Sequence, residues 1–200
     1  VVDTITGGKE AESFTQTKGA DVLDGGAGTD TYTGALLTET GSSNATTGIV
    51  VNLSSAAIAE ATILGNAGMY LGGTSTGVAA GTVEGGYAAD LAGNVSLADT
   101  VSNIETFVGT TGRDYFQGSA GAETFTGGAA NDYVSTGLGA DTITVAFGGE
   151  GVDTIADFTG GAGGDIFKFT GSTDVNDASG TDLDVDGFLL ISTSAAHAIV

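Results

Sequence analysis

The sequence predicts an all-β fold: a right-handed parallel β-roll, or β-solenoid, of nonapeptide repeats with an irregular β-rich insertion. Two observations lead to this prediction. Acidic residues recur every nine positions, and an apolar residue follows each of them by two positions. Glycine accounts for 36 of 200 residues and proline is absent, which permits tight turns between uninterrupted strand ladders. A fixed short period of this kind is typical of repeat architectures.

The acidic period occurs in two blocks. The first block contains Asp3, Glu12, Asp21 and Asp30, followed two positions later by Ile5, Phe14, Leu23 and Tyr32. The second contains Glu105, Asp114, Glu123, Asp132 and Asp141, with Phe107, Phe116, Phe125, Val134 and Ile143. The register then slips by three residues twice, to Asp153 with Ile155 and to Asp165 with Phe167.

Glycine completes the repeat. Residues 25–33, 148–156 and 160–168 all read G-G-x-G-x-D-x-U-x, where U is apolar. The first six residues predict a turn, because glycine tolerates positive φ. The last three predict a short strand with one inward side chain. Two repeats then form one 18-residue coil, with a strand on each face and a turn at each edge.

Stacking of the coils brings acidic residues together. Adjacent strands lie about 4.8 Å apart, so residues 18 positions apart become neighbours. We expect Asp114 to stack with Asp132, and Glu123 with Asp141, and likewise Asp3 with Asp21 and Glu12 with Asp30. Two carboxylates about 5 Å apart repel by roughly 3 kcal/mol at an effective dielectric constant near 20. Such columns therefore require a cation.

Calcium suits these columns best. Ca²⁺ takes six to eight oxygen ligands in flexible geometry, whereas Mg²⁺ retains its waters. Zinc prefers His or Cys, and the chain has one His and no Cys. We therefore expect several Ca²⁺ ions, held by carboxylates and turn carbonyls. The candidate acids are Asp3, Glu12, Asp21, Asp30, Asp114, Glu123, Asp132, Asp141, Asp153, Asp157 and Asp165, and the candidate turn glycines are Gly26, Gly28, Gly128, Gly139, Gly149, Gly151, Gly161 and Gly163.

Some repeats depart from the pattern. Glu10 and Ala130 occupy positions where the repeat has glycine. Glu12 and Glu123 replace aspartate and reach one methylene farther. We expect weaker calcium binding, or none, at these repeats. Asp157, at the end of the second block, is a last ligand in one reading and a surface acid in the other.

The nonapeptide resembles the calcium-binding repeat of RTX (repeats-in-toxin, hemolysin-type) proteins. The resemblance covers residues 1–33 and about 100–168, and is poor over 34–99. It implies Ca²⁺ between the turns of adjacent coils, folding coupled to calcium outside the cell, and type I secretion. It divides the chain into an N-terminal repeat block (1–33), a non-repeat insertion (34–99), a C-terminal β-roll (100–168) and an acidic loop with a terminal strand (169–200).

The insertion contains a predicted strand and a predicted short helix. GIVVNL (48–53) favours a strand, and residues 54–64 favour a helix capped by Ser54 or Ser55. We expect the insertion to flank or close the roll, and a partner-binding role is the alternative. Ser75 in GTSTG (73–77) resembles a hydrolase nucleophile, but His197 is the only histidine, so we interpret the match as accidental and identify no catalytic constellation.

The tail is acidic. Asp182, Asp184, Asp186 and Gly187 match the first half of an EF-hand loop, but Thr193 stands where the bidentate Glu belongs. A solvated acidic loop before a final strand, GFLLIS, is the favoured interpretation, and a single calcium turn is the alternative.

Composition restricts the function classes. With 25 acidic and 4 basic residues the net charge is −21, which excludes nucleic acid and anionic membranes as expected partners. No run of 18 apolar residues predicts a membrane span. We expect a secreted, extracellular or cell-surface calcium-binding structural protein, assembling with its own copies as in a bacterial surface layer. The alternatives are the calcium-binding and secretion module of a type I secreted enzyme or toxin (protease, lipase or hemolysin) and a fragment of an RTX adhesin.

Overall fold

The computed structural model describes residues 2–17, 19–35, 47–69, 77–85, 98–146, 151–170 and 190–191. Within these residues it has one helix, α1 (Glu60–Ala67), and seventeen strands. The strands are β1 (Thr4–Thr6), β2 (Ser13–Thr15), β3 (Val22–Asp24), β4 (Thr31–Thr33), β5 (Thr47–Asn52), β6 (Ile58–Ala59), β7 (Gly77–Val78), β8 (Thr82–Gly85), β9 (Asp99–Ser102), β10 (Thr106–Val108), β11 (Arg113–Gln117), β12 (Thr124–Thr126), β13 (Tyr133–Ser135), β14 (Thr142–Ala146), β15 (Thr154–Ile155), β16 (Ile166–Thr170) and β17 (Leu190–Ile191).

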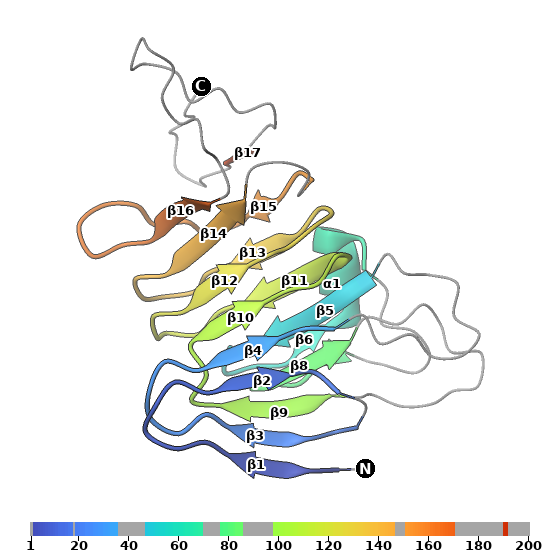
Figure 1. The fold of residues 1–200 in the computed structure, drawn as a ribbon. Coiled ribbons are helices and arrows are strands. Elements are labelled where there is room, and N and C mark those ends of the chain that lie inside the picture. The colour runs from blue at the N-terminus through green and yellow to red at the C-terminus, as the bar shows by residue number, and fades with distance from the viewer. Residues whose placement is uncertain are drawn as a thin grey trace.

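Two sheets form the faces of a parallel β-roll of about six coils, which confirms the predicted fold class (Figure 1). Sheet A has the order β1-β3-β9-β8-β5-β11-β13-β15-β17, and sheet B has the order β16-β14-β12-β10-β4-β2. Successive coils contribute one strand to each sheet. Within both sheets the described pairings are parallel, except those that β8 makes with β5 and β9.

The registers match the sequence period. Thr4 pairs with Val22 and Thr124 with Thr142, both 18 residues apart. At the predicted slips the separation grows by three and then by six: Tyr133 pairs with Thr154, and Thr142 with Ile166. The extra residues are therefore accommodated in the turns, and the stacking of the strands continues without interruption.

The two repeat blocks form a single stack. β3 pairs with β9 and β4 pairs with β10, so the second block continues directly on the first. In its described residues the insertion contributes strands to sheet A and none to sheet B, and β6 and β7 form a separate two-stranded sheet. In sheet A, β5 and β8 pair with each other in antiparallel fashion and separate β9 from β11, whereas in sheet B β10 pairs with both β4 and β12. Two extra strands lengthen sheet A by about 10 Å relative to sheet B. We call β5 and β8 the wedge, because they separate neighbouring coils on one face of the roll.

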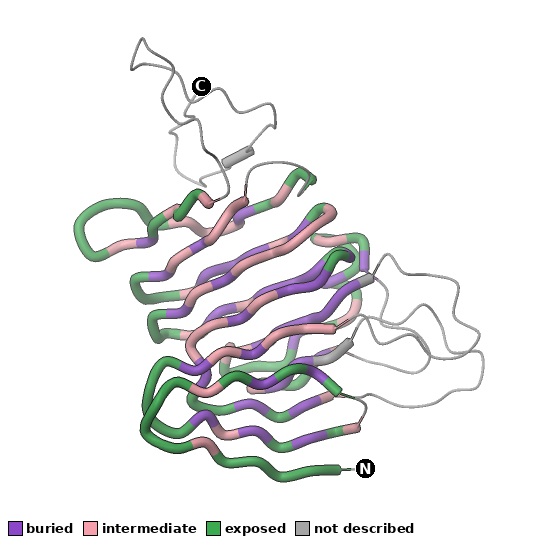
Figure 2. Tube along the Cα trace, in the orientation of Figure 1, coloured by how far each residue is buried: buried purple, intermediate pink, exposed green. Residues whose placement is uncertain are grey.

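The core lies between the two sheets. The inner position of the repeat supplies most of it: Phe14, Leu23, Tyr32, Phe107, Phe116, Phe125, Val134, Ile143 and Ile155 are all buried. Alternating burial along the strands is visible in Figure 2. The wedge adds Ile49, Val51 and Val83 to the same cluster. Ile5 is 47% exposed, because no described coil lies beyond β1, and Phe167 is only partly buried.

A second apolar cluster lies on the outer face of sheet A. It contains Val50, Ile58, Ile63, Met69, Val78 and Tyr115. Helix α1 packs here against β11 (Figure 1). The strand expected at 48–53 is confirmed as β5. The expected helix start and cap are wrong: α1 begins at Glu60 without a side-chain cap, since Ile58 and Ala59 pair with β7 and Ser54 instead bonds to Asn52.

Several predicted features lie outside the described residues. They are Ser75, Gly149, the EF-hand-like loop at 182–187 and His197. In the described part of the chain, no helix is both long enough and apolar enough to span a bilayer.

Candidate metal centre

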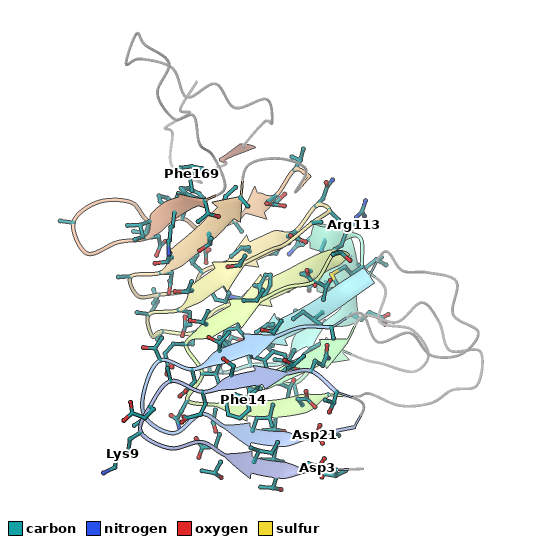
Figure 3. All side chains as sticks on the ribbon, viewed as in Figure 1. Asp3, Lys9, Phe14, Asp21, Arg113 and Phe169 are labelled. Atoms are coloured by element: carbon teal, nitrogen blue, oxygen red, sulfur yellow. The ribbon has the colours of Figure 1, made fainter. Side chains whose placement is uncertain are left out.

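The acidic residues form two columns, one at each edge of the roll. The A-to-B edge, where the chain passes from sheet A to sheet B, carries Glu12, Asp30, Glu105, Glu123, Asp141 and Asp165. The B-to-A edge carries Asp3, Asp21, Asp99, Asp114, Asp132 and Asp153. Asp3 and Asp21 stack at one edge and Lys9 lies at the other (Figure 3). The predicted vertical neighbours therefore share an edge.

Hydrogen bonds connect each column. The backbone N–H of an acidic residue donates to the carboxylate one coil further along the stack. On the A-to-B edge the pairs are Glu12 to Asp30 (2.6 Å), Asp30 to Glu105 (2.9 Å), Glu123 to Asp141 (2.7 Å) and Asp141 to Asp165 (3.0 Å). On the B-to-A edge they are Asp3 to Asp21 (2.8 Å), Asp21 to Asp99 (3.0 Å), Asp114 to Asp132 (2.9 Å) and Asp132 to Asp153 (2.9 Å). One oxygen of each accepting carboxylate thus binds backbone.

The second oxygen often binds the residue's own turn. Oδ2 of Asp114 accepts a hydrogen bond from the Thr110 N–H (2.7 Å), and Oδ2 of Asp165 accepts one from the Thr159 N–H (2.7 Å). The longer glutamates also fold back, Glu12 onto the Gly8 N–H (3.0 Å) and Glu123 onto the Ser119 N–H (3.2 Å). In these four residues, an N–H of a nearby turn therefore already bonds to one carboxylate oxygen.

Among the described residues, Asp30 and Asp141 each have one carboxylate oxygen without a hydrogen-bond donor. Each is fully buried, and its Oδ2 accepts no hydrogen bond from any residue that the structure describes. The reason lies in a neighbouring acid. In other repeats the N–H four residues before the acid donates to it, as Thr110 does to Asp114. Here the equivalent Gly26 N–H donates to Asp24 (3.1 Å) instead, and the equivalent Gly137 N–H donates to Asp157 (3.1 Å). A buried carboxylate oxygen without a donor is unfavourable unless a cation binds it.

The surroundings of these oxygens are rich in acceptors. A Cβ added to Gly25 would lie 2.6 Å from Oδ2 of Asp30 and would also meet the carbonyl oxygen of Asn103. Hence glycine leaves a small cradle between a carboxylate and a carbonyl of the next turn. In the described part of the chain, no three His, Cys, Asp or Glu side chains gather as one metal site. Carbonyl oxygens must therefore complete any ligand set, which fits Ca²⁺.

Two pKa values are strongly raised. Burial, together with the nearby Glu123 and Asp165 side chains, raises the pKa of Asp141 to about 7 against the hydrogen bond from the Glu123 N–H. Burial also raises the pKa of Asp114 to about 7 against its hydrogen bonds from Thr110 and Ile49. Burial likewise raises the pKa of Asp99 and Asp153. In the absence of a cation, negative charge at these positions is therefore unfavourable.

The turn glycines adopt the backbone conformation that the repeat predicts. Gly26 has φ +93° and Gly28 has φ +142°, and positive φ also occurs at Gly128, Gly139, Gly151, Gly161 and Gly163. Ala130, at a glycine position of the repeat, adopts φ +73°. The backbone therefore keeps the repeat conformation at this position in spite of the methyl group.

Asp157 occupies a capping position. Its two oxygens accept hydrogen bonds from the N–H and hydroxyl of Thr136, the hydroxyl of Ser135 and the N–H of Gly137. Four donors around one carboxylate favour stabilisation of the 135–137 turn. This contact frees Oδ2 of Asp141, because it removes the Gly137 N–H from the site.

Sequence reasoning missed Asp99 as a member of the B-to-A column and Asp24 as an acceptor beside the other column, and it placed Glu105 in the repeat without naming it a candidate ligand. Asp99 continues the B-to-A edge and also accepts a 2.6 Å hydrogen bond from the buried Tyr32 hydroxyl. A signal was present, because Val101 follows Asp99 by two positions. However, Glu105 comes only six residues after Asp99. The shortened turn concealed the repeat.

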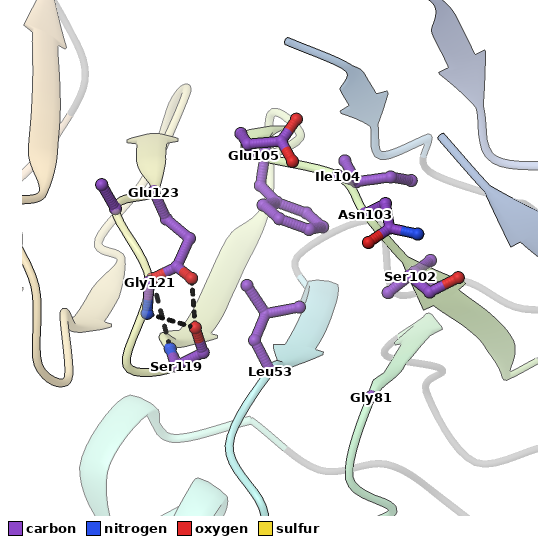
Figure 4. A pocket seen from close by; sticks show the side chains of 12 residues that line it. Leu53, Gly81, Ser102, Asn103, Ile104, Glu105, Ser119, Gly121 and Glu123 are labelled. Carbon is purple, nitrogen blue, oxygen red and sulfur yellow. Dashed lines mark hydrogen bonds between the residues drawn. The ribbon is translucent and has the colours of Figure 1, made fainter. Parts of the chain in front are cut away.

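The wedge also opens a pocket of about 360 Å³ between the turns at 103–105 and 118–123 (Figure 4). Leu53 and Gly81, next to the two wedge strands, contribute to its lining. The series of hydrogen bonds between acidic residues of adjacent coils along the A-to-B edge is interrupted here, between Glu105 and Glu123. The Glu105 N–H donates to the Asp30 carbonyl (3.3 Å), and the Glu123 carboxylate bonds to Ser119.

A family model described as the RTX calcium-binding nonapeptide repeat matches residues 17–36 and 104–143, in four copies. The chain contains RTX calcium-binding repeats. Asp30 and Asp141, whose Oδ2 atoms lack donors, both lie inside the matched RTX segments. No curated protein matches the chain.

Proposed function

We propose that this RTX roll binds several Ca²⁺ ions between the turns of adjacent coils and folds as it binds them. The observation that supports this most strongly is the pair of buried oxygens, Oδ2 of Asp30 and Oδ2 of Asp141, that accept no hydrogen bond from the described residues. Both lie in the RTX segments and at the same edge of the roll. A cation between turns satisfies the carboxylate and the neighbouring carbonyls together.

Asp30 and Asp141 are the principal proposed ligands. A carboxylate oxygen that already accepts one hydrogen bond keeps a lone pair for a cation. We therefore propose further ligands at the equivalent positions Asp3, Glu12, Asp21, Asp114, Glu123, Asp132, Asp153 and Asp165. The carbonyls of the turns that contain Gly26, Gly28, Gly128, Gly139, Gly149, Gly151, Gly161 and Gly163 complete these sites. The contacts of Asp157 favour a cap, with a ligand role as the alternative.

Calcium supplies folding free energy in this proposal. A ligand at 100 times its Kd stabilises the folded state by about 2.7 kcal/mol for each site. Several such sites oppose the self-repulsion of a chain with a net charge of −21. The chain therefore remains unfolded at low calcium and forms the roll at the higher concentrations found outside cells.

The proposed setting is extracellular or on a bacterial cell surface, after type I secretion, as a structural and assembling element rather than a catalyst. The second candidate function is the calcium-binding and secretion module of a secreted enzyme, toxin or adhesin. Electron microscopy separates them: an assembling protein forms sheets or filaments when Ca²⁺ is added, whereas a secretion module remains monomeric.

A calcium titration followed by circular dichroism tests the binding proposal. Strand signal should appear on addition of Ca²⁺ and disappear with chelator. Isothermal titration calorimetry on Asp30→Asn and Asp141→Asn should each show at least one site fewer than the unmodified chain. Asp90→Asn, which makes the same charge change outside the acidic period, is the matched control. If all three variants behave alike, the proposed ligands are wrong.

A further inference from the structure

The outer face of sheet B is an ordered array of threonine. Side chains alternate across a strand, so the residues flanking each buried core residue point outward. Strand pairing aligns these outer residues in two rows. The first row is Ser13, Thr31, Thr106, Thr124, Thr142 and Ile166, and the second is Thr15, Thr33, Val108, Thr126, Thr144 and Lys168. On the four central strands, every position except Val108 is threonine.

The face is uncharged in a strongly acidic protein. The chain has 25 acidic residues, yet none occupies either row, and Lys168 at one end is the single basic residue there. The outer face of sheet A is different. It includes Asp24 and the stacked pair Tyr115 and Tyr133, and helix α1 packs against its strand β11. Outward threonines also occur on sheet A, at Thr4, Thr6, Thr100 and Thr154, but there they are interrupted by Val22, Asp24 and the tyrosines, so only sheet B carries a continuous array in the described residues.

The array is regular and stiff. Neighbouring threonines along a row are separated by the strand spacing of about 4.8 Å, and the two rows by about 6.6 Å, two residues along a strand. Threonine is β-branched and has few χ1 rotamers, so each hydroxyl and methyl is held in position before any partner arrives. Thr124, Thr126 and Thr142 are half-buried by their neighbours, which restricts them further.

The size of the face argues against a stable protein partner. Six strands and two rows cover roughly 24 by 7 Å, a few hundred Å² at most. A stable protein interface needs about 800 Å² on each side. A periodic, uncharged lattice is a different kind of partner, because every repeat of the array can make the same contact with it.

We propose that the outer face of sheet B binds the surface of ice. On prism faces of hexagonal ice, water molecules repeat on a rectangular grid whose two spacings are close to the strand spacing and the row separation. Threonine hydroxyls donate to and accept from lattice waters, while the methyl groups fill the spaces between them. Charged groups order the surrounding water in hydration shells that differ from the arrangement in ice, and none lies on the four central strands. This inference needs only the folded roll and goes beyond the calcium proposal.

The test uses the 200-residue chain saturated with Ca²⁺. Thermal hysteresis is measured in a nanolitre osmometer, and enrichment in slowly growing ice is measured with a cysteine-free acidic protein as reference. Thr124→Tyr places a bulky ring in the centre of the face and should reduce hysteresis at least fivefold. Thr154→Tyr makes the same exchange at an exposed position in β15 of sheet A and should leave hysteresis unchanged.

A smaller substitution controls for the possibility that Thr124→Tyr fails to fold. Thr124→Ser with Thr126→Ser removes two methyl groups only and should halve hysteresis or more, with an unchanged calcium titration by circular dichroism. Absence of hysteresis in the folded chain overturns the inference. So does equal hysteresis in Thr124→Tyr and Thr154→Tyr, or a dimer in sedimentation that Thr124→Tyr dissociates without any ice enrichment, which assigns the face to a second copy. Failure of the calcium titration alone contradicts the proposed function and not this inference.

Discussion

The backbone N–H of Glu123 donates a 2.7 Å hydrogen bond to Oδ1 of Asp141, eighteen residues further along the chain. The same relationship recurs along both edges of the roll. One oxygen of each accepting carboxylate thus holds two coils together, and the other oxygen is the more accessible one for a cation. Whether that oxygen is free depends on the local turn, and this decides which acids are the strongest candidate ligands.

Asp141→Asn separates the two roles of this carboxylate. The amide oxygen still accepts the Glu123 N–H, and the amide is neutral, so the metal-free roll should become more stable at pH 8. Calcium binding should weaken, because the ligand charge is lost. We expect the calcium midpoint to rise at least tenfold, or about 1.4 kcal/mol. Calorimetry and chemical unfolding with and without Ca²⁺ measure both effects. A midpoint equal to that of Asp90→Asn contradicts this assignment.

Acid should stabilise the metal-free roll. The pKa values of Asp114 and Asp141 are raised to about 7 in the folded state, against 3.8 for the unfolded side chain. Between these values the folded chain binds more protons than the unfolded chain, so its stability falls as pH rises from about 4 to about 7. Circular dichroism of calcium-free protein should show more strand at pH 5 than at pH 8. A stability that rises over this range is the opposite result.

Calcium binding should release protons by the same linkage. At pH 6.5 the raised pKa values of Asp114 and Asp141 favour the protonated form in those metal-free molecules that have formed the roll, whereas unfolded molecules hold these carboxyls ionised. A metal ligand must be ionised. Calorimetry in two buffers of different ionisation enthalpy measures the protons released. We expect release at pH 6.5 and much less at pH 8.5. Identical heats in both buffers at pH 6.5 exclude the linkage.

Asp157→Ala tests the cap. Removing this carboxylate leaves three donors without their acceptor and the Thr136 hydroxyl with Asp165 alone, which should destabilise the calcium-loaded roll by about 2–4 kcal/mol. The released Gly137 N–H should then bond to Oδ2 of Asp141 and compete with calcium there. Urea unfolding and calorimetry report the two effects. Asp90→Ala is the control, and a lost calcium site with unchanged stability identifies Asp157 as a ligand instead.

Ala130→Gly should stabilise the protein. Ala130 has φ +73°, a conformation that costs about 1–2 kcal/mol for a residue with a Cβ. Relief of this strain outweighs the larger conformational entropy of glycine in the unfolded chain, so we expect a gain of about 1 kcal/mol. The adjacent Ala129→Gly has no strain to relieve and should lower stability. Thermal unfolding in Ca²⁺ compares the two, and a loss of stability in both refutes the strain argument.

Much of the fold followed from the local period. Phe107, Phe116 and Phe125 are buried where the pattern of an acid plus two positions predicts, and the slips before Asp153 and Asp165 fall at the predicted turns. The antiparallel wedge of β5 and β8 did not follow, because its strands carry no repeat and pair with residues far away in the chain. Asp99 was missed for a related reason: its turn is three residues short.

The sequence by itself determined the coil, the inner apolar positions and the acidic columns, because each repeat encodes its own turn and strand. Only the tertiary structure decided which carboxylate oxygens are free. Oδ2 of Asp30 and Oδ2 of Asp141 lack donors because Asp24 and Asp157 take the nearby N–H groups. Competition among acceptors for one N–H depends on positions in space, and no spacing along the chain reveals its outcome.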